Sequence, residues 1–164
     1  MPRTRPPSRR ACAVWKGTAE LSVRAATADD HPALEALAAA AALGGRRPGL
    51  HLAEHLALPP GEDHFHLLLE GAEAAPVAYL SAGGSRDADG KGGAEIYELV
   101  VGDAAGSAGE LVTAALGVLG DAGYGDVTCW ARLAGARGVS ALRAAGFSAE
   151  EVAGAGTRYR LTRS

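Results

Sequence analysis

The chain has 164 residues, of which 48% are hydrophobic, 21% charged and 5% aromatic. This length suits one domain with a single core, and the apolar share is close to that of globular proteins. The net charge of −3 gives no support to nucleic-acid binding across the whole chain. Because no stretch reaches the roughly 18 apolar residues of a membrane span, we expect a soluble, cytoplasmic protein that binds neither nucleic acid nor membrane.

The first 20 residues are rich in Arg and Pro and show no apolar periodicity. Such a composition is typical of a disordered tail. Ser8-Arg9-Arg10 is faintly similar to a twin-arginine export signal, but only the short run Ala11 to Trp15 follows it, and an export segment needs roughly 7–15 apolar residues. We therefore divide the chain into a basic tail at 1–20 and a single domain at 21–164.

Apolar periodicity and turn residues predict ten elements after the tail. In chain order they are a strand at 21–25, helices at 27–43 and 50–58, strands at 65–70, 77–82 and 94–101, a helix at 105–122, a strand at 126–132, a helix at 136–145 and a strand at 157–162. Thr27 is suited to cap the first helix, and Gly44-Gly45 to end it. This order predicts an α/β fold with one mixed sheet and helices on its faces.

The most informative stretch runs from the strand at 94–101 through the small-residue turn at 102–109 into the next helix. A strand, a glycine-containing turn and a helix in this order place backbone N–H groups where they can bind an anion. Glu95 and Glu98 add two carboxylates to the strand. The stretch therefore predicts a site that handles an acyl or phosphate group.

This order of elements resembles the GNAT superfamily, the acetyl-CoA-dependent N-acyltransferases. The likeness covers about residues 21–162, and three pieces carry it. They are the strand at 94–101, the helix that begins near Leu111-Val112, and the C-terminal half with 121–124, the Val127 strand and 142–147, which ends in Gly-Phe. The resemblance implies a mixed, mostly antiparallel sheet with helices on both faces.

The resemblance also implies the function, which is transfer of an acyl group from acetyl-CoA or another acyl-CoA cosubstrate to an amine. The acceptor would be a small molecule or a peptide. The backbone of Leu99, Val100 and Val101 would bind the pantetheine arm. The N–H groups near the start of the helix, at Gly106, Ser107, Ala108 and Gly109, would bind the pyrophosphate. No metal is implied, and the sequence is compatible with a homodimer.

Glu95 or Glu98 would take the proton of the acceptor ammonium, because only a neutral amine attacks a thioester. Strict alternation along a strand puts these two side chains on opposite faces. They can reach one site only if the strand contains a bulge, which the resemblance implies. The ordinary alternative is that both are solvated strand residues.

The segment around the second helix lines the acceptor side in the family. His51, Glu54 and His55 are therefore expected to shape the choice of substrate. His51 and His55 stand four apart, but the metalloprotease order His-Glu-x-x-His is absent. A surface helix is the alternative reading of this segment.

Three positions depart from the family pattern. Asp103 stands where the loop usually has Arg or Gln, and the loop is about three residues short. A carboxylate there repels a pyrophosphate. Leu142 stands where a tyrosine often protonates the departing thiolate, and Gly135 where an asparagine often contacts CoA. Tyr97, Tyr124 or water remain as alternative proton donors.

These departures leave three hypotheses. The first is an acyl-CoA-dependent N-acyltransferase that works by direct attack, without a covalent enzyme intermediate. The second is a catalytically degenerate GNAT-fold module that binds a ligand or a partner protein. The third keeps the fold and uses an acyl donor other than acetyl-CoA.

The remaining reactive side chains point to structure more than to chemistry. His64 and His66 face the same side of a strand, but no Cys or carboxylate stands at ligand spacing, so we expect no metal there. Cys12 and Cys129 indicate neither a disulfide framework nor a metal site. Cys129 lies within a strand pattern and is expected to be a buried thiol. Trp130 can face either the site or the core.

Overall fold

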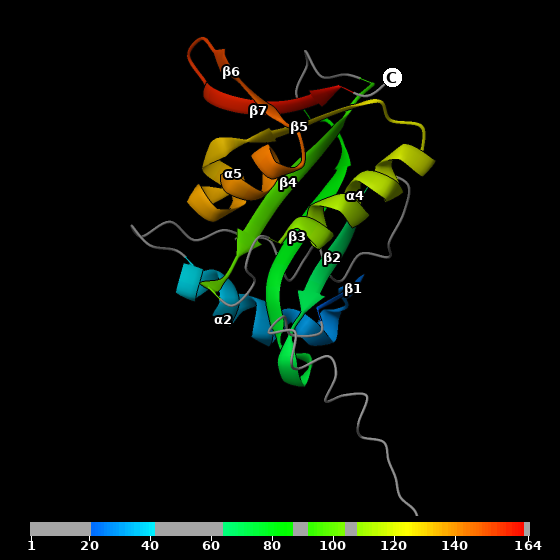
Figure 1. Cartoon of the computed structure of the whole chain (residues 1–164), viewed down its shortest axis with the longest axis vertical. Coiled ribbons are helices and arrows are strands. Elements are labelled where there is room, and N and C mark those ends of the chain that lie inside the picture. Colours follow the sequence, from blue (N-terminus) through cyan, green and yellow to red (C-terminus); the bar gives the residue numbers. More distant parts are fainter. Residues whose placement is uncertain (1–20, 42–63, 87–91, 104–107, 163–164) are drawn as a thin grey trace, which may run out of the picture.

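The computed structural model describes residues 21–41, 64–86, 92–103 and 108–162. In this part of the chain seven strands form one sheet in the order β1-β2-β3-β4-β5-β7-β6 (Figure 1). Its strands are β1 (Ser22–Ala25), β2 (His64–Glu70), β3 (Pro76–Gly84), β4 (Ala94–Val101), β5 (Asp126–Trp130), β6 (Ser148–Val152) and β7 (Gly156–Thr162). Only β4 and β5 pair in parallel, and the other neighbours pair antiparallel. The expected mixed, mostly antiparallel sheet is confirmed.

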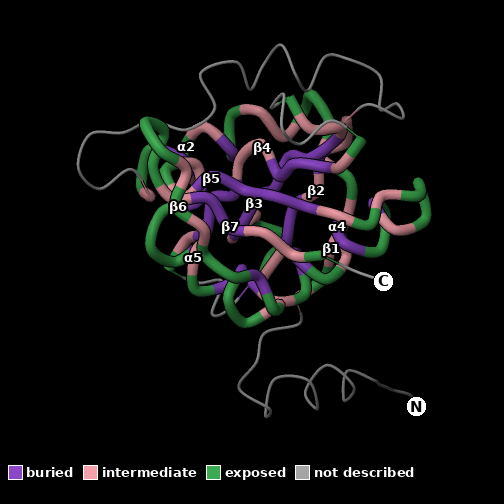
Figure 2. Tube along the Cα trace, turned by 90° about the horizontal axis from the view of Figure 1, so that it is seen from above, coloured by how far each residue is buried: buried purple, intermediate pink, exposed green. Residues whose placement is uncertain are grey.

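Helices cover both faces of this sheet. The described helices are α2 (His31–Ala41), α4 (Gly109–Asp121) and α5 (Gly135–Ala144). Leu34 of α2 belongs to a buried cluster with Leu68, Tyr79 and Val100 on one face. Helices α4 and α5 contribute their apolar side chains to the larger core on the opposite face. The middle strands are accordingly the most buried part of the molecule (Figure 2), as two-sided cover requires.

Sequence periodicity located these elements well, with four differences. Helix α2 begins at His31, because the expected first turn of the helix is a separate 3₁₀ turn, Ala28–Asp30. Strand β6 was not predicted, because its sequence SAEEV has no apolar alternation and its residues are mostly exposed. Helix α4 begins at Gly109, since Ala108 has a left-handed backbone with φ of 55°. Strand β5 ends at Trp130, where a 3₁₀ turn, Ala131–Leu133, follows. The predicted helix at 50–58 lies outside the described residues.

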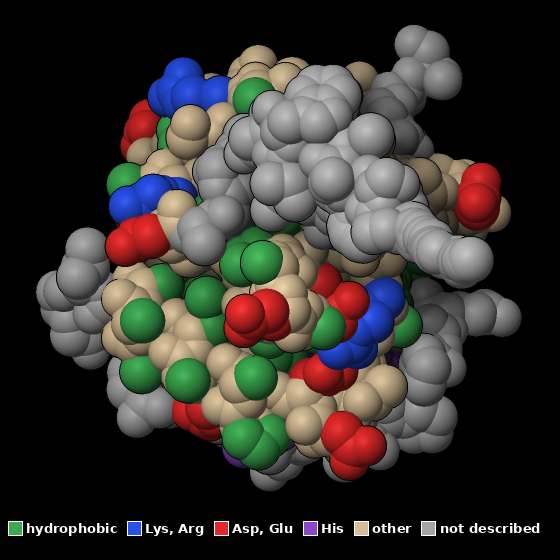
Figure 3. All heavy atoms as spheres, turned by 60° about the horizontal axis from the view of Figure 1, so that its bottom comes forward, with side chains coloured by type: hydrophobic (Ala, Val, Ile, Leu, Met, Phe, Trp, Pro, Cys, Tyr) green, Lys and Arg blue, Asp and Glu red, His purple; other side chains and the backbone are tan. Residues whose placement is uncertain are grey.

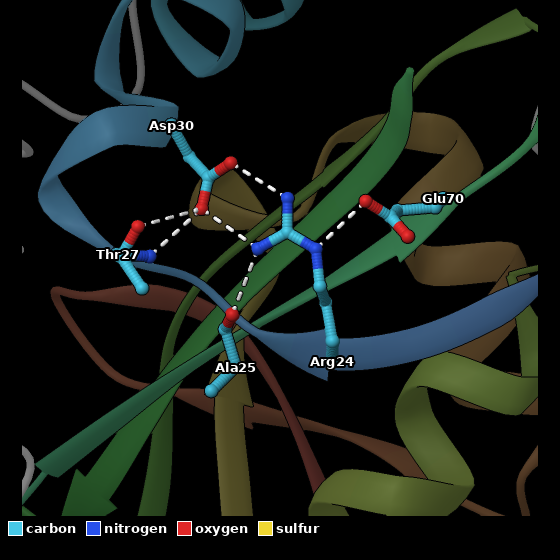
Figure 4. A network of polar contacts seen from close by, with 5 residues as sticks. All are labelled: Arg24, Ala25, Thr27, Asp30 and Glu70. Atoms are coloured by element: carbon cyan, nitrogen blue, oxygen red, sulfur yellow. Dashed lines mark hydrogen bonds and ion pairs between the residues drawn. The ribbon is translucent and has the colours of Figure 1, made fainter. Parts of the chain in front are cut away.

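A polar network fixes the entry to α2 (Figure 4). Asp30 accepts hydrogen bonds from the backbone N–H of Thr27 at 2.8 Å and from the guanidinium of Arg24 at 2.7 and 2.9 Å. Arg24 also binds Glu70 of β2 at 2.7 Å. The guanidinium lowers the pKa of Asp30 to about 2, with burial opposing the shift. The network thus ties β1, β2 and the 3₁₀ turn Ala28–Asp30 together, with Thr27 at the expected cap position.

Candidate active site

A bulge in β4 brings Glu95 and Glu98 to one face of the sheet. Glu95 lies opposite Gly83 of β3 and Glu98 opposite Ser81, while the register shifts between them. Between these two pairs the chain of β4 advances by three residues and that of β3 by two, so that Tyr97 is the extra, bulged residue. Since Gly83 and Ser81 share a face, so do the two carboxylates. The strand has the bulge that the resemblance implies, and both glutamates face the side that α2 covers.

Glu95 is held by Arg86. Its side chain is 1% exposed, and its carboxylate accepts hydrogen bonds from the backbone N–H of Arg86 at 2.9 Å and from the guanidinium at 2.9 and 3.4 Å. The guanidinium also lies over the Tyr97 ring, 4.2 Å from its centroid. The Tyr97 hydroxyl donates to the Gly84 carbonyl at 2.6 Å. These contacts balance a buried carboxylate with an opposite charge and with backbone and side-chain donors, and they favour a structural part for Glu95.

Glu98 has different surroundings. It is half-buried and lies opposite Ser81, in the same row as His66 of β2. The pKa of nearby Tyr79 is raised well above its usual range, first by burial and then by the negative charge of Glu98. The Tyr79 hydroxyl lies 3.2 Å from Nδ1 of His66. Of the two expected bases, Glu98 therefore lies near the Tyr79–His66 pair, whereas Glu95 is paired with Arg86.

Buried polar atoms extend along this face. His64 Nε2, Ser81 Oγ and Thr128 Oγ1 are buried and have no hydrogen-bond partner among the described residues. Thr128 lies beside Glu95 in the parallel pairing of β4 and β5. A buried polar atom without a partner costs about 1–3 kcal/mol, and each such group in a folded protein calls for an explanation. A polar ligand on this face would supply the missing partners.

Strands β4 and β5 separate beyond this point. Their pairing runs over Ala94–Val127, Glu95–Thr128 and Ile96–Cys129 and then stops, although β4 continues to Val101. Residues 99–101 pair with β3 on one side and, within the described part of the chain, with no strand on the other. The expected binding of an extended ligand by the backbone of Leu99, Val100 and Val101 stays a prediction, and this stretch of β4 has the open side that it needs.

The start of α4 is the expected anion site. Ala108 is buried, and its carbonyl accepts from the N–H groups of Leu111 and Val112 at the amino end of the helix. Gly106 and Ser107 lie outside the described residues. The carboxylate of Asp103 is 2.7 Å from the guanidinium of Arg137 on α5. The positive charge of Arg137 therefore offsets the negative charge that Asp103 places near the start of α4.

The other two departures, Leu142 and Gly135, both belong to α5. The Leu142 side chain is fully buried in the core and has no proton to offer a leaving group. Gly135 begins α5 with φ of +68°, a conformation that suits glycine. Tyr124 approaches the end of β3, since a Cβ at Gly84 would lie 3.3 Å from its hydroxyl.

Cys129 and Trp130, two further candidate residues, are both buried. Cys129 is buried, and burial, with a smaller effect of Glu95, raises the pKa of its thiol, so it is the expected buried thiol. Trp130 is 6% exposed and lies beneath the guanidinium groups of Arg132 and Arg158, at 4.7 and 5.2 Å from the ring centroid. The substrate candidates His51, Glu54 and His55 lie outside the described residues, as does Cys12.

Sequence reasoning considered His66 only as a metal ligand, and it gave no part to several other residues near the candidate site, namely Tyr79, Ser81, Arg86, Thr128 and Arg137. Ser81 and Thr128 carried a usable signal, because each is a polar residue within an otherwise apolar strand pattern. Among the described residues no group of three His, Cys, Asp or Glu side chains is placed to hold a metal ion. In the same part of the chain no helix is long and apolar enough to cross a membrane.

The face of the molecule seen in Figure 3 carries charges of both signs. In this view, which turns the lower end of the molecule forward, basic side chains lie directly beside acidic ones, with hydrophobic groups scattered between them.

The sheet order, the bulged β4 and its separation from β5 define a GNAT-like fold. The GNAT domain of S. lividans PAT is similar to this chain with a TM-score of 0.66 and 16% sequence identity, over 85% of this chain and 89% of that one. The paia N-acetyltransferase of Thermoplasma acidophilum, solved in complex with coenzyme A, has a TM-score of 0.66 at 12% identity, over 87% and 99%.

An aminoglycoside acetyltransferase, also solved with coenzyme A, matches with a TM-score of 0.61 at 17% identity, over 88% of this chain and 95% of that one. No family model and no curated protein matches the sequence. At these identities the likeness shows the fold, and the chemistry rests on the residues of this chain.

Proposed function

We propose that the protein is an acyl-CoA-dependent N-acyltransferase that acts on an amine of a small molecule or a peptide. The observation that carries this proposal is the position of Glu98. It lies on the bulge of β4, next to the point where β4 and β5 separate, on a face with buried, unpartnered polar atoms. The structural neighbours solved with coenzyme A support it through their shared fold.

The binding of acyl-CoA would use backbone groups. Residues 99–101 would hydrogen-bond the pantetheine arm along the free side of β4, and the amino end of α4 at Gly109 would attract the diphosphate. Ala108, with Gly106 and Ser107 before it in the sequence, would also contribute to the proposed anion site. Arg137 offsets the charge of Asp103 there. Selection of the acceptor by His51, Glu54 and His55 also belongs to the proposal.

Catalysis would proceed by direct attack. Glu98 accepts a proton from the acceptor ammonium, and the neutral amine then attacks the thioester carbonyl. The tetrahedral adduct expels the CoA thiolate. A second proton moves from the nitrogen to the thiolate sulfur, which gives the amide and free CoA thiol. A positioned base of this kind contributes typically 10²–10⁴-fold to the rate. Glu95 would hold the strand and the adjoining segment in place through Arg86.

A second candidate function is a GNAT-fold module that binds a ligand or a partner protein without catalysis. The burial of Leu142 favours it, because the usual proton donor has no replacement at that position. A donor other than acetyl-CoA would keep the same chemistry with a different acyl chain.

Thermal unfolding with acetyl-CoA and with longer acyl-CoAs tests the proposal. A ligand present at 100 times its Kd stabilises a protein by about 2.7 kcal/mol. Release of free CoA thiol across a panel of amines then tests turnover, with Glu98→Gln as the variant that should bind but not transfer. An unfolding temperature that does not change at millimolar acyl-CoA would contradict acyl-CoA binding. Binding without turnover would favour the non-catalytic module.

A further inference from the structure

Trp130 ends strand β5 on the face of the sheet that carries Glu98. Val127 and Cys129 belong to the core beneath α4 and α5, so Trp130 points to the opposite face. Cys129 is the last residue of β5 to pair with β4, through Ile96. Beyond this pair Trp130 follows on β5, and Glu98 follows on β4 after the bulge. The indole and the proposed base therefore stand on the two sides of the point where the strands separate.

Two guanidinium groups lie over the Trp130 ring. That of Arg132 is 4.7 Å from the ring centroid, and that of Arg158 is 5.2 Å from it. The Arg158 side chain is 4% exposed, and its Nε donates to the Glu150 carboxylate at 2.6 Å. Arg160 binds the same carboxylate at 3.1 Å. The buried half of the stack is therefore a cation held in place by a carboxylate that it shares with another guanidinium.

Arg132 is the exposed half of the stack. It belongs to the 3₁₀ turn Ala131–Leu133, which contacts both β4 and β7 and so lies across the opening between β4 and β5. One nitrogen of its guanidinium is 3.5 Å from the Ala155 carbonyl. The indole orients this guanidinium, whose planar fork of N–H donors matches a carboxylate. A carboxylate bound there would also reduce the repulsion between two cations on one ring.

We propose that Arg132 binds a carboxylate of the acceptor, so that the substrate is an amine that also carries a carboxylate, as an amino acid does. This inference rests on the proposed function and names its substrate class. Glu98 would take the ammonium proton on the β4 side of the opening, while Arg132 holds the carboxylate on the β5 side. An acceptor held at two points is oriented for attack on the thioester.

Arg158 has a different part from Arg132 in this arrangement. It is a positioning residue, because it lies against the Trp130 ring on which the Arg132 guanidinium rests, and its buried charge adds to the positive potential. The single charge of a carboxylate suits this opening better than the double charge of a phosphate, since Glu98 and Glu150 already place negative charges around it.

Acetyl transfer to the standard L-amino acids, each beside its own α-carboxamide, tests the preference. The amide keeps the amine and the side chain and lacks only the negative charge. Loss of that charge lowers the pKa of the amine, which by itself favours the amide, so a preference for the acid reports recognition of the carboxylate. For acids that serve as acceptors, kcat/KM should exceed that of the amide by about 10–100-fold. Equal values for every acid and its amide would overturn the proposal.

R132Q tests the residue assigned to the carboxylate. It should reduce the ratio of acid to amide kcat/KM by about 10–100-fold, and R132K should restore only part of that ratio, because an ammonium lacks the planar fork. R143Q is the matched control. Arg143 is also exposed and lies 5.2 Å over a buried ring, that of Tyr159, but on the opposite face of the sheet. A preference for the acid that survives in R132Q would overturn the proposal.

Trp130 fluorescence separates this inference from the proposed function. Trp15 is the only other tryptophan in the sequence, so in W15F the emission comes from Trp130 alone. Without acyl-CoA, the acids should change this emission saturably, and R132Q should abolish the change. Acids that bind in this way while no amine is acetylated would overturn the proposed function and leave the carboxylate site. Acetylation of amines with no preference for a carboxylate would overturn the carboxylate site alone.

Discussion

Arg86 neutralises the buried carboxylate of Glu95 from a position nine residues earlier in the chain. The contact joins the segment after β3 to the first half of β4, and it leaves the Arg86 side chain 55% exposed while Glu95 is 1% exposed. The pair is therefore asymmetric: one partner can return to water and the other cannot.

This asymmetry predicts unequal effects of the two single substitutions. Arg86→Ala leaves an unpaired buried charge and should lower the free energy of unfolding by about 2–4 kcal/mol. Glu95→Gln removes the buried charge itself and should cost about 1–2 kcal/mol. Urea unfolding of both variants and of the double variant checks this. A larger loss in Glu95→Gln than in Arg86→Ala would contradict the structural part given to Glu95.

Glu98→Gln should separate catalysis from stability. The substitution keeps the size of the side chain and removes the proton acceptor, so kcat should fall by about 10²–10³-fold. The midpoint of thermal unfolding and the stabilisation by acetyl-CoA should change little, because Glu98 is only half-buried. Steady-state kinetics of both variants check this, with Glu95→Gln as the matched control. Equal losses of kcat in the two variants would argue against Glu98 as the base.

Asp103 and Arg137 should have opposite effects on cofactor affinity. Asp103→Asn removes a negative charge near the start of α4 and frees the guanidinium of Arg137, so acetyl-CoA should bind about two- to fivefold more tightly. Arg137→Ala should weaken binding by a similar factor. Both residues are exposed, so titration calorimetry should show the effects fading at high salt. A tighter complex in Arg137→Ala would place the diphosphate elsewhere.

The network at Asp30 predicts a loss of stability in acid. The folded-state pKa of Asp30 is about 2, below the usual value of 3.8 for an aspartate, because Arg24 binds the ionised form. The stabilisation is therefore complete above about pH 4 and disappears as the pH falls toward 2. Since Arg24 is partly exposed, Asp30→Asn should cost about 1–2 kcal/mol at neutral pH. Unfolding curves should show this difference shrinking below about pH 4.

Gly138 of α5 packs against β4 and should not accept a methyl group. A Cβ there would lie 2.9 Å from Ala134 Cβ and 3.3 Å from Leu99 Cγ. Overpacking costs about 1–3 kcal/mol, against a gain in helix propensity of about 1 kcal/mol, so Gly138→Ala should destabilise by about 1 kcal/mol. Gly117 of α4 has open space around its Cβ position, and Gly117→Ala should instead stabilise by about 0.5–1 kcal/mol.

The fold was accessible from the sequence because its buried elements have clear periodicity. Strands β2, β3, β4 and β7 lie within two residues of their predicted bounds. Strand β6 was not predicted because it is an exposed edge strand, and within the described sheet its only strand neighbour is β7. Its residues follow no core face, so periodicity carried no information about it.

The candidate site was accessible only in part. Glu98 could be named from its strand, but the burial of Glu95 depends on Arg86, which returns to β4 across a hairpin. The link between His66 and Tyr79 depends on the register of β2 against β3, because the residues are 13 positions apart. Neither contact is a local property of the chain, so neither could be predicted from spacing.

The short parallel pairing between β4 and β5 has a mechanical consequence. Strands β1–β4 form one antiparallel block and β5–β7–β6 another, and three residue pairs join their backbones. Within the described sheet this seam is therefore the weakest line along which the blocks can shear apart. A ligand bound along the free part of β4 and against α5 would brace both blocks, so amide hydrogen exchange at residues 127–129 should slow more on binding than exchange within either block.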